Sequence, residues 1–560
     1  VRLNDTRGAQ TDLDAAIPLI GKPKDPTEDS IPSGLRARLA EVQAQTLART
    51  DRAGAIAKFG EAVREALNTH YRPFVASLLI QRAELYRLDG NRTAARADLQ
   101  ASIVALQKEE QALIKGVPRL PGGEILWSAY FARFQPAYRQ LIHYLIDDGT
   151  DADAFLYAEK SRAFELLQLV RSRADVPSAF REATDEGEPY SIDRLRQVLP
   201  AGTYVLEYEV LNDRTYVWLI RRDGPPELRT LHIGESEIAG WTATLQALAA
   251  ERNVEGFETA LVAPYQGLLQ EVVGRIASLQ HGVPARLVIV PDRAMHGLPF
   301  AALGRHKHYL IREHAVSVAA SATLYAWALA QDQQLSHAPL GTALLFADPK
   351  FNRDLDVARG LPPLRQTEKE AARIRAVYAP VMHVDERDQQ LATVPELLRL
   401  MRQSTITHIA AHGVANADAP SGSFLLLAPT ENDTGALDAD RLLAGLHLDK
   451  TRLVVLSSCS SVGGTPVGPE GIAPLVRPLT AAGVPGVVGT LWNIGENSAT
   501  AELLVRFHRH YREGHDAADA LRLAENEMLK DPDLERSSVL AWAPFQMVGY
   551  ASSPFPLPVN

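Results

Sequence analysis

The sequence predicts an α/β protein in which a mostly parallel sheet is flanked by helices and preceded by an α-helical solenoid. From about residue 200 onward, short apolar strands alternate with helices, as in sheets that carry helices on both faces. Some of these strands are apolar at every position, which is typical of strands buried on both sides. From Ser33 to about Leu106, Ala, Leu and Ile recur at spacings of three and four, the period of packed helices.

Composition places the chain among globular proteins and limits its partners. With 560 residues it is too long for one ordinary core, so roughly three or four domains are expected. The formal net charge of −10 provides no basic field for nucleic acid, and no apolar run approaches the roughly 20 residues of a transmembrane helix. We therefore expect neither a nucleic-acid nor a membrane partner.

The single cysteine cannot form an intramolecular disulfide, which favours a reducing, cytoplasmic location. Residue 1 is valine rather than methionine, so we expect a processed or trimmed N-terminus, from which any targeting segment has been removed.

A helical repeat is predicted near the N-terminus, after a polar segment that reads as a tail or cap. Small and bulky apolar residues recur in the same order at two places, 40 residues apart. They are Ala55, Phe59 and Ala62, and then Ala95, Leu99 and Ser102. The pattern resembles tetratricopeptide (TPR) repeats, whose period is about 34 residues. Helices are also predicted at 127–146 and 152–173, and the polar, acidic stretch that follows them favours a linker.

The second half of the chain predicts the sheet. Residues 203–210 and 215–220 flank a short polar turn and predict a β-hairpin. The elements expected after it are a strand at 286–290, a helix at 322–330, a strand at 343–346, helices at 368–377 and 394–402, a strand that ends at His412, a helix at 437–446, a strand at 453–456, a helix at 470–482, a strand at 486–492 and a helix at 498–511.

Two of these strands end on residues that carry chemistry. His412, followed by Gly413, ends one apolar strand, and Cys459 follows another. Chemistry in open α/β sheets collects beyond the carboxyl ends of parallel strands, so the imidazole and the thiol are expected side by side. A neighbouring imidazole takes the thiol proton and returns it to a leaving amine. The backbone N–H groups of Gly413 and Cys459 are candidates for binding the oxyanion.

Seven segments in order resemble the CHAT domain, a caspase-like and separase-like cysteine peptidase domain often found with TPR repeats. They are Val290–Phe300, His408–Gly413, Ser423–Leu427, Leu453–Cys459, Gly468–Ile472, Gly486–Asn493 and Trp542–Gly549. The resemblance covers about residues 200–550 and implies that His412 and Cys459 form the catalytic dyad. The residues after the cysteine, Ser460 and Ser461, are more similar to the Cys-Ser-Ser of separase than to many CHAT domains.

The resemblance implies a caspase-like α/β fold and a cysteine endopeptidase that needs no cofactor. The expected domains are a tail or capping segment (1–33), a TPR-like helical domain (34–175), a linker (176–200), an N-terminal, pseudo-protease-like part of the CHAT region (201–335) and a catalytic caspase-like subdomain (336–560). The substrate is expected to be a protein, with a protein regulator on the TPR-like region. The alternative is a catalytically inactive TPR-CHAT scaffold that acts through protein contacts.

Acidic residues near the dyad in sequence are candidates for a pocket that accepts a basic residue, because a carboxylate pairs with a guanidinium in bidentate fashion. These are Glu431, Asp433, Asp438, Asp440 and Glu470. His508, His510 and His515 also lie close together in the chain, but we expect no metal there. A carboxylate or cysteine at ligand spacing on the same face is not evident, so a solvated face is the prediction.

Overall fold

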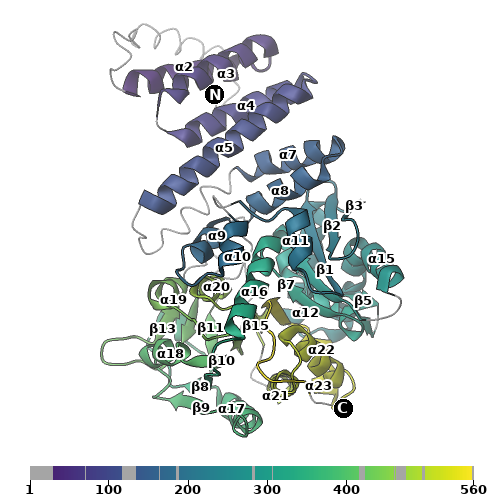
Figure 1. Ribbon diagram of the computed structural model, residues 1–560, viewed down its shortest axis with the longest axis vertical. Coiled ribbons are helices and arrows are strands. Elements are labelled where there is room, and N and C mark those ends of the chain that lie inside the picture. The colour runs from purple at the N-terminus through teal and green to yellow at the C-terminus, as the bar shows by residue number, and fades with distance from the viewer. Residues whose placement is uncertain are drawn as a thin grey trace. The chain divides into compact units, whose positions relative to one another are not determined.

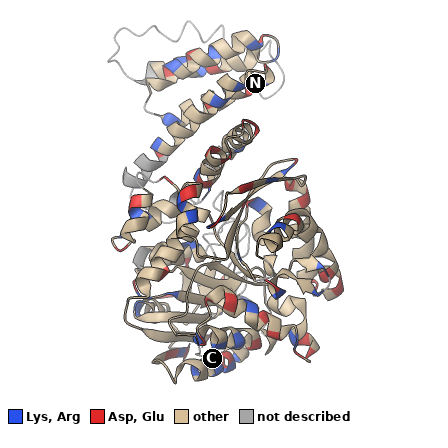
Figure 2. Cartoon of the chain, turned by 45° about the vertical axis from the view of Figure 1, so that its right-hand side comes forward, with Lys and Arg blue, Asp and Glu red and all other residues tan. Residues whose placement is uncertain are grey.

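The computed structural model describes residues 30–69, 71–116, 134–162, 164–184, 188–280, 284–305, 307–414, 423–458, 461, 475–494 and 498–557. Contacts divide the chain into two compact units, Val1–Leu120 with Phe131–Ala158 and Pro121–Tyr130 with Glu159–Asn560 (Figure 1). Basic and acidic residues are interspersed along both units rather than gathered by sign (Figure 2).

The first unit consists of consecutive packed helices. They are α2 (Ser30–Leu47), α3 (Arg52–Leu67), α4 (Arg72–Leu88), α5 (Arg92–Gly116), α7 (Gln135–Asp147) and the larger part of α8 (Asp151–Ser161). Both members of the predicted repeat are buried: Ala55, Phe59 and Ala62 on α3, and Ala95, Leu99 and Ser102 on α5. The prediction of a TPR-like helical region before the sheet is confirmed, while residues 127–133 of the helix predicted at 127–146 lie outside the described residues.

The segment predicted to be a linker contains two short helices. After α9 (Phe164–Arg171) come α10 (Ser178–Ala183) and α11 (Ile192–Val198). Phe180, Ile192 and Leu195 are buried although their neighbours are polar. The Tyr190 N–H also donates to Thr323 Oγ1 at 2.9 Å. A few apolar residues at helical spacing therefore fold this acidic stretch onto the second unit.

The second unit is built on strands at the positions that the sequence predicts, with additional short ones. They are β1 (Thr203–Val210), β2 (Thr215–Arg221), β3 (Glu227–Leu231), β4 (Arg286–Val290), β5 (Gly304–Arg305), β6 (His308–Tyr309), β7 (Ala315–Val318), β8 (Thr342–Pro349), β9 (Val384–Gln389), β10 (Ser404–Ala410), β11 (His412–Val414), β12 (Phe424–Leu426), β13 (Ala436–Asp438), β14 (Leu453–Leu456), β15 (Gly486–Thr490) and β16 (Phe545–Gly549).

Among the described residues, eleven strands form one sheet in the order β3-β2-β1-β4-β7-β16-β15-β14-β10-β8-β9. One half, β1-β4-β7-β16, is parallel, and so is the other half, β15-β14-β10-β8-β9. The two halves meet at the antiparallel pair β15 and β16. The predicted hairpin is the antiparallel pair β1 and β2. The fold class predicted from the sequence, a mostly parallel sheet flanked by helices, is confirmed.

Helices accompany both halves of the sheet (Figure 1). They are α12 (Glu235–Ala250), α13 (Val254–Ala260), α14 (Val262–Pro264), α15 (Gln270–Gln280), α16 (Ala322–Leu335), α17 (Arg365–Tyr378), α18 (Val394–Met401), α19 (Ala439–Gly445), α20 (Val476–Ala482), α21 (Ser498–Arg512), α22 (Ala517–Met528), α23 (Leu534–Ser537) and α24 (Val539–Trp542). None of the described helices combines the length and the apolar character that crossing a membrane requires.

The core explains why the strands of the second half are nearly all apolar. Leu453 and Val455 of β14 pack in one buried cluster with Ile374 of α17 and with Leu504 and Phe507 of α21. All four residues of β14 are buried. Burying a large aliphatic side chain contributes about 1.5–3 kcal/mol. This core fixes the ends of β10 and β14, where the candidate site lies.

Candidate active site

The strands that precede the two predicted catalytic residues are direct neighbours. β10 and β14 run parallel, and their register pairs His408 with Val455 and Ile409 with Leu456. The Ser457 N–H continues this ladder by donating to the Ile409 carbonyl at 2.9 Å. The carboxyl ends of both strands therefore lie at the same edge of the sheet, as predicted.

His412 is fixed through one ring nitrogen. Its Nε2 lies 2.8 Å from the carbonyl oxygen of Pro362, in the segment before α17. A carbonyl only accepts hydrogen bonds, so Nε2 carries the proton and donates it. In the neutral ring, Nδ1 is then the unprotonated nitrogen, and it has no hydrogen bond to a described residue. The imidazole is thus held in the tautomer whose Nδ1 can accept a proton.

The ring of His412 is also fixed by packing. The side chain is buried, with 8% of the residue exposed. The ring of Phe351, which follows β8, meets it edge to face at 5.1 Å between centroids. On the main chain, β11 pairs antiparallel with β12, which sets His412 opposite Leu426 and Gly413 opposite Leu425. Backbone pairing, an aromatic contact and a hydrogen bond together restrict the imidazole to one orientation.

Cys459 and Ser460 lie outside the described residues, but the residues on either side are anchored to β15. The Thr490 hydroxyl donates to the Ser458 carbonyl at 2.6 Å, and the Thr490 N–H donates to Ser461 Oγ at 2.9 Å. All three residues are buried. Thr490 therefore ties both sides of the cysteine position to the core of the sheet.

The acidic pocket candidates differ in their surroundings. Asp433 accepts from the Gly435 N–H at 2.8 Å and pairs with Arg441, so it holds the turn between β12 and β13. Burial acts to raise the pKa of Asp433, but the hydrogen bonds from Arg441 and Gly435 outweigh it and leave the pKa below its ordinary value. Asp438 is the N-cap of α19 and accepts from the Arg441 N–H at 2.8 Å.

Of the other three candidates, Glu431 and Asp440 lie within the described residues. Glu431 is exposed on the same turn as Asp433, and Asp440 is half-buried in the first turn of α19. Glu470 lies outside the described residues. The use of any of the five carboxylates by a substrate stays a prediction.

Three residues that contribute to the site, Pro362, Phe351 and Thr490, belong to none of the motifs recognised in the sequence. The contribution of Pro362 is a backbone carbonyl, which any residue could provide, although the Pro362-Pro363 pair in the sequence marks a restricted backbone. Phe351 resembles any core aromatic residue. Thr490 is the last residue of an otherwise apolar strand, and a polar residue at that position was the available signal.

The expectation of a solvated histidine face is wrong for His508, which is completely buried. It lies on the apolar side of α21, with Leu504 one turn before it and Tyr511 one turn after it. Burial, and then the neighbouring His408, hold the pKa of His508 well below its ordinary value.

His508 belongs to a buried chain of hydrogen bonds. Its Nδ1 lies 2.8 Å from the Tyr378 hydroxyl, and its Nε2 lies 3.1 Å from Nδ1 of His408. His408 Nε2 is in turn 2.8 Å from Glu370 Oε1. Because His408 is on β10 and Glu370 on α17, the chain of hydrogen bonds connects the strand that leads to His412 with α17 and α21.

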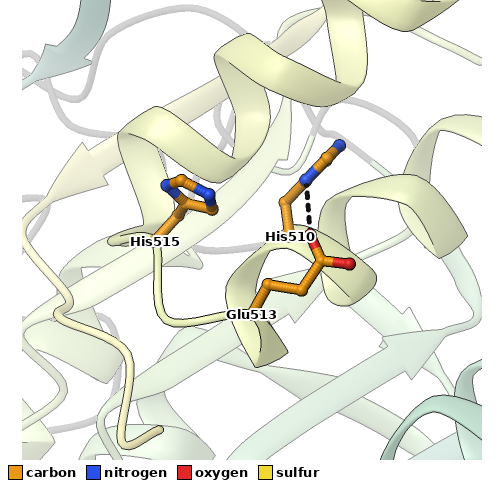
Figure 3. A group of neighbouring side chains, drawn as sticks. All are labelled: His510, Glu513 and His515. Carbon is orange, nitrogen blue, oxygen red and sulfur yellow. Dashed lines mark hydrogen bonds and ion pairs between the residues drawn. The ribbon is translucent and has the colours of Figure 1, made fainter. Parts of the chain in front are cut away.

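The reason given against a metal site is also wrong, because a carboxylate does lie at ligand spacing. Glu513 follows His510 by three residues, and its Oε2 is 3.0 Å from His510 Nδ1. The ligand atoms of His510, Glu513 and His515 all lie within 4.8 Å of one another (Figure 3).

Comparison with known proteins identifies the family. A family model described as "CHAT domain" matches residues 258–550, more than half of the chain. No match was found among curated proteins.

Two solved structures of the Saccharomyces cerevisiae separase–securin complex are similar to the chain. The one at 3.0 Å resolution has 9% sequence identity, a TM-score of 0.46 and coverage of 97% of this chain and 48% of the matched chain. The one at 2.6 Å has 10% identity, a TM-score of 0.41 and the same coverage. The chain spans about half the length of these matched chains. From the match to its family model, the protein belongs to the CHAT domain family.

Proposed function

We propose that the protein is a caspase-like cysteine endopeptidase in which Cys459 is the nucleophile and His412 the general base and acid. The observation that carries the proposal is the register of β10 and β14. Leu456 is paired with Ile409, 47 residues earlier, and Cys459 likewise follows His412 by 47 residues. His412 and Cys459 each come three positions after one member of this register pair, and the two strands end at the same edge of the sheet.

The tautomer of His412 fits this role. With Nε2–H donated to the Pro362 carbonyl, Nδ1 is the nitrogen that takes the thiol proton. The thiolate then attacks the scissile carbonyl carbon, and the carbonyl oxygen becomes an oxyanion that the N–H groups of Gly413 and Cys459 bind. The imidazolium gives its proton to the leaving amine, which departs and leaves a thioester on Cys459.

Water completes the cycle. His412 Nδ1 takes a proton from the water molecule that attacks the thioester, and the thiolate leaves as the carboxylic acid product forms. The proton on the imidazolium then neutralises the thiolate or passes to solvent. The anchoring of Ser458 and Ser461 by Thr490 supports the proposal, because a nucleophile must be held within hydrogen-bond reach of its base.

For the substrate, we propose a protein with a basic residue before the scissile bond. Among the five candidate carboxylates, Glu431 is the first proposed to receive it, because Glu431 is exposed and Asp433 and Asp438 already stabilise the β12–β13 turn and α19. The TPR-like helices are proposed to recruit the substrate or a regulator, since stacked helix pairs present extended surfaces to proteins.

A comparison of newly formed protein N-termini tests the activity. Wild type, Cys459→Ala and His412→Ala are each added to a proteome, and the new N-termini are identified by mass spectrometry. We expect fragments that appear with wild type alone, with a shared residue before the cleavage point. Identical patterns from all three proteins would contradict peptidase activity and favour a scaffold.

A further inference from the structure

Three side chains with metal-binding atoms, His510, Glu513 and His515, converge where α21 ends (Figure 3). His510 is on the last turn of α21, and Glu513 and His515 follow it. One ligand atom from each lies within 4.8 Å of the others, and the shortest pair, His510 Nδ1 and Glu513 Oε2, is 3.0 Å apart. The rings of His510 and His515 are 6.0 Å apart between centroids.

The backbone brings these residues together. Gly514 has a φ of +97°, which L-residues rarely adopt. Its N–H donates to the Tyr511 carbonyl at 3.2 Å, and the His515 N–H donates to the His510 carbonyl at 3.3 Å. These two bonds define a Schellman motif, in which the second residue after the helix contacts the residue five positions earlier. That contact is commonly apolar, whereas here both positions are histidines.

A second carboxylate orients His510 from the neighbouring helix. Glu527 of α22 has its Oε1 2.8 Å from His510 Nε2. The other oxygen of Glu527 accepts from Arg509 at 2.5 Å. Histidines that bind metals almost always donate their second ring N–H to a carboxylate, carbonyl or water, which fixes the tautomer. An Nε2–H donated to Glu527 leaves His510 Nδ1 free for a metal, on the side where Glu513 lies.

The groups around His510 suit a bound cation. Both ring nitrogens face carboxylate oxygens, Nδ1 that of Glu513 and Nε2 that of Glu527. A divalent cation bound to Nδ1 would place positive charge between the two carboxylates. Two imidazoles and one carboxylate are ligands that suit Zn²⁺ and similar first-row ions.

We propose that His510, Glu513 and His515 bind a divalent transition-metal ion of the zinc class, with Glu527 as the residue that positions His510. Three protein ligands leave one tetrahedral position for water. The site connects the end of α21 to α22, so metal binding stabilises the packing of these two helices. The proposal does not depend on peptidase activity.

Zinc binding by the full chain in a Cys459→Ala background tests the proposal, because this background removes the thiol as a competing ligand. Protein freed of metal with a chelator is titrated with ZnCl₂ against a chromophoric chelator, and its melting temperature is recorded with and without ZnCl₂. We expect one equivalent of Zn²⁺ to bind through this site and to raise the melting temperature. Glu527→Gln is expected to weaken binding by about 10- to 100-fold.

His515→Ala and Glu513→Gln are expected to abolish this equivalent. The matched control is His383→Ala, which removes an exposed histidine that lies 3.5 Å from the Asp385 carboxylate. That variant should bind as the parent does. Absence of zinc binding, or equal binding by His515→Ala and His383→Ala, would overturn the proposal.

Discussion

The Nε2 atom of His412 lies 2.8 Å from the carbonyl oxygen of Pro362. The two residues are 50 positions apart, and the contact connects the first residue of β11, which follows β10, to the segment before α17. Because a carbonyl oxygen can only accept a hydrogen bond, the N–H proton of the neutral imidazole is on Nε2. No carboxylate is needed to select this tautomer. In the proposed mechanism, a main-chain oxygen takes the orienting role that Asp has in Ser-His-Asp triads.

Replacing Thr490 by valine should impair the site without removing a catalytic group. The substitution keeps the shape and leaves the buried Ser458 carbonyl without its donor, which costs about 1–3 kcal/mol. We expect a lower unfolding midpoint and slower cleavage of a peptide that spans a site found in the N-terminus comparison. Thr407→Val is the matched control, since Thr407 has a buried hydroxyl that is bonded to Ser404 instead. Equal cleavage by both variants would contradict the anchoring role.

The edge-to-face contact of Phe351 with His412 is expected to affect rate. Such pairs contribute about 0.5–1.5 kcal/mol, so Phe351→Leu should lower kcat/KM by up to about tenfold. Leu355→Ala, which removes apolar surface from the cluster around Phe351, is the control for stability. A Phe351→Leu protein with unchanged kcat/KM would show that the aromatic contact does not orient the imidazole.

Substitutions at Asp438 and Glu431 should have different effects, the first on stability and the second on substrate preference. Asp438→Ala removes the N-cap of α19 and should lower stability by about 1 kcal/mol, measured by urea unfolding. Glu431→Gln, at an exposed position, should leave the unfolding curve unchanged and reduce the preference for a basic residue before the scissile bond. An unchanged ratio of kcat/KM for arginine and alanine peptides would remove Glu431 from the pocket.

A buried carboxyl on α22 predicts a pH dependence of stability. Glu525 is fully buried, and neither side-chain oxygen has a hydrogen-bond partner among the described residues. Burial raises the pKa of Glu525 well above its ordinary value. The folded state therefore retains the proton to higher pH than the unfolded state. The contribution of protonated Glu525 to the free energy of unfolding is fully present below the pKa of the unfolded state, about 4.5. It is lost as the pH rises through the pKa of the folded state.

Glu525→Gln, which stays neutral, should remove this loss. The gain in unfolding free energy over wild type should be small near pH 4.5 and should grow with pH, by at most about 1.4 kcal/mol per pH unit. Urea unfolding between pH 4.5 and 8 measures it. A pH-independent difference between the two proteins would contradict burial of an uncharged carboxyl.

Much of the fold could be predicted because its signals are local. Apolar strands such as 453–456 and helices such as 498–511 follow from periodicity, and the order of motifs places His412 and Cys459 after strands. The residues at which exposed helices begin and end are harder to predict from the sequence. The acidic stretch near Phe180 looked like a linker because composition does not show that a few apolar residues pack against α16.

The contacts that refine the site are not local, which is why the sequence does not reveal them. The Pro362 carbonyl is a main-chain atom 50 residues from His412, and the bond depends on how the segment before α17 folds. His508 looked exposed beside His510, yet α21 turns it into the core. His510 and His515 come close because the chain turns at Gly514. Residue spacing along a single helix face does not predict this contact, since His515 lies beyond the end of the helix.

The rate at which iodoacetamide alkylates Cys459, followed by mass spectrometry from pH 5 to 10, tests the central claim most directly. The chain has one cysteine, so the reading is unambiguous. For wild type we predict fast alkylation at neutral pH, with an apparent thiol pKa below the ordinary value of about 8.5. His412→Ala should alkylate about tenfold or more slowly at pH 7, and His383→Ala as wild type. Equal rates and equal pH profiles in all three proteins would contradict a thiol activated by His412.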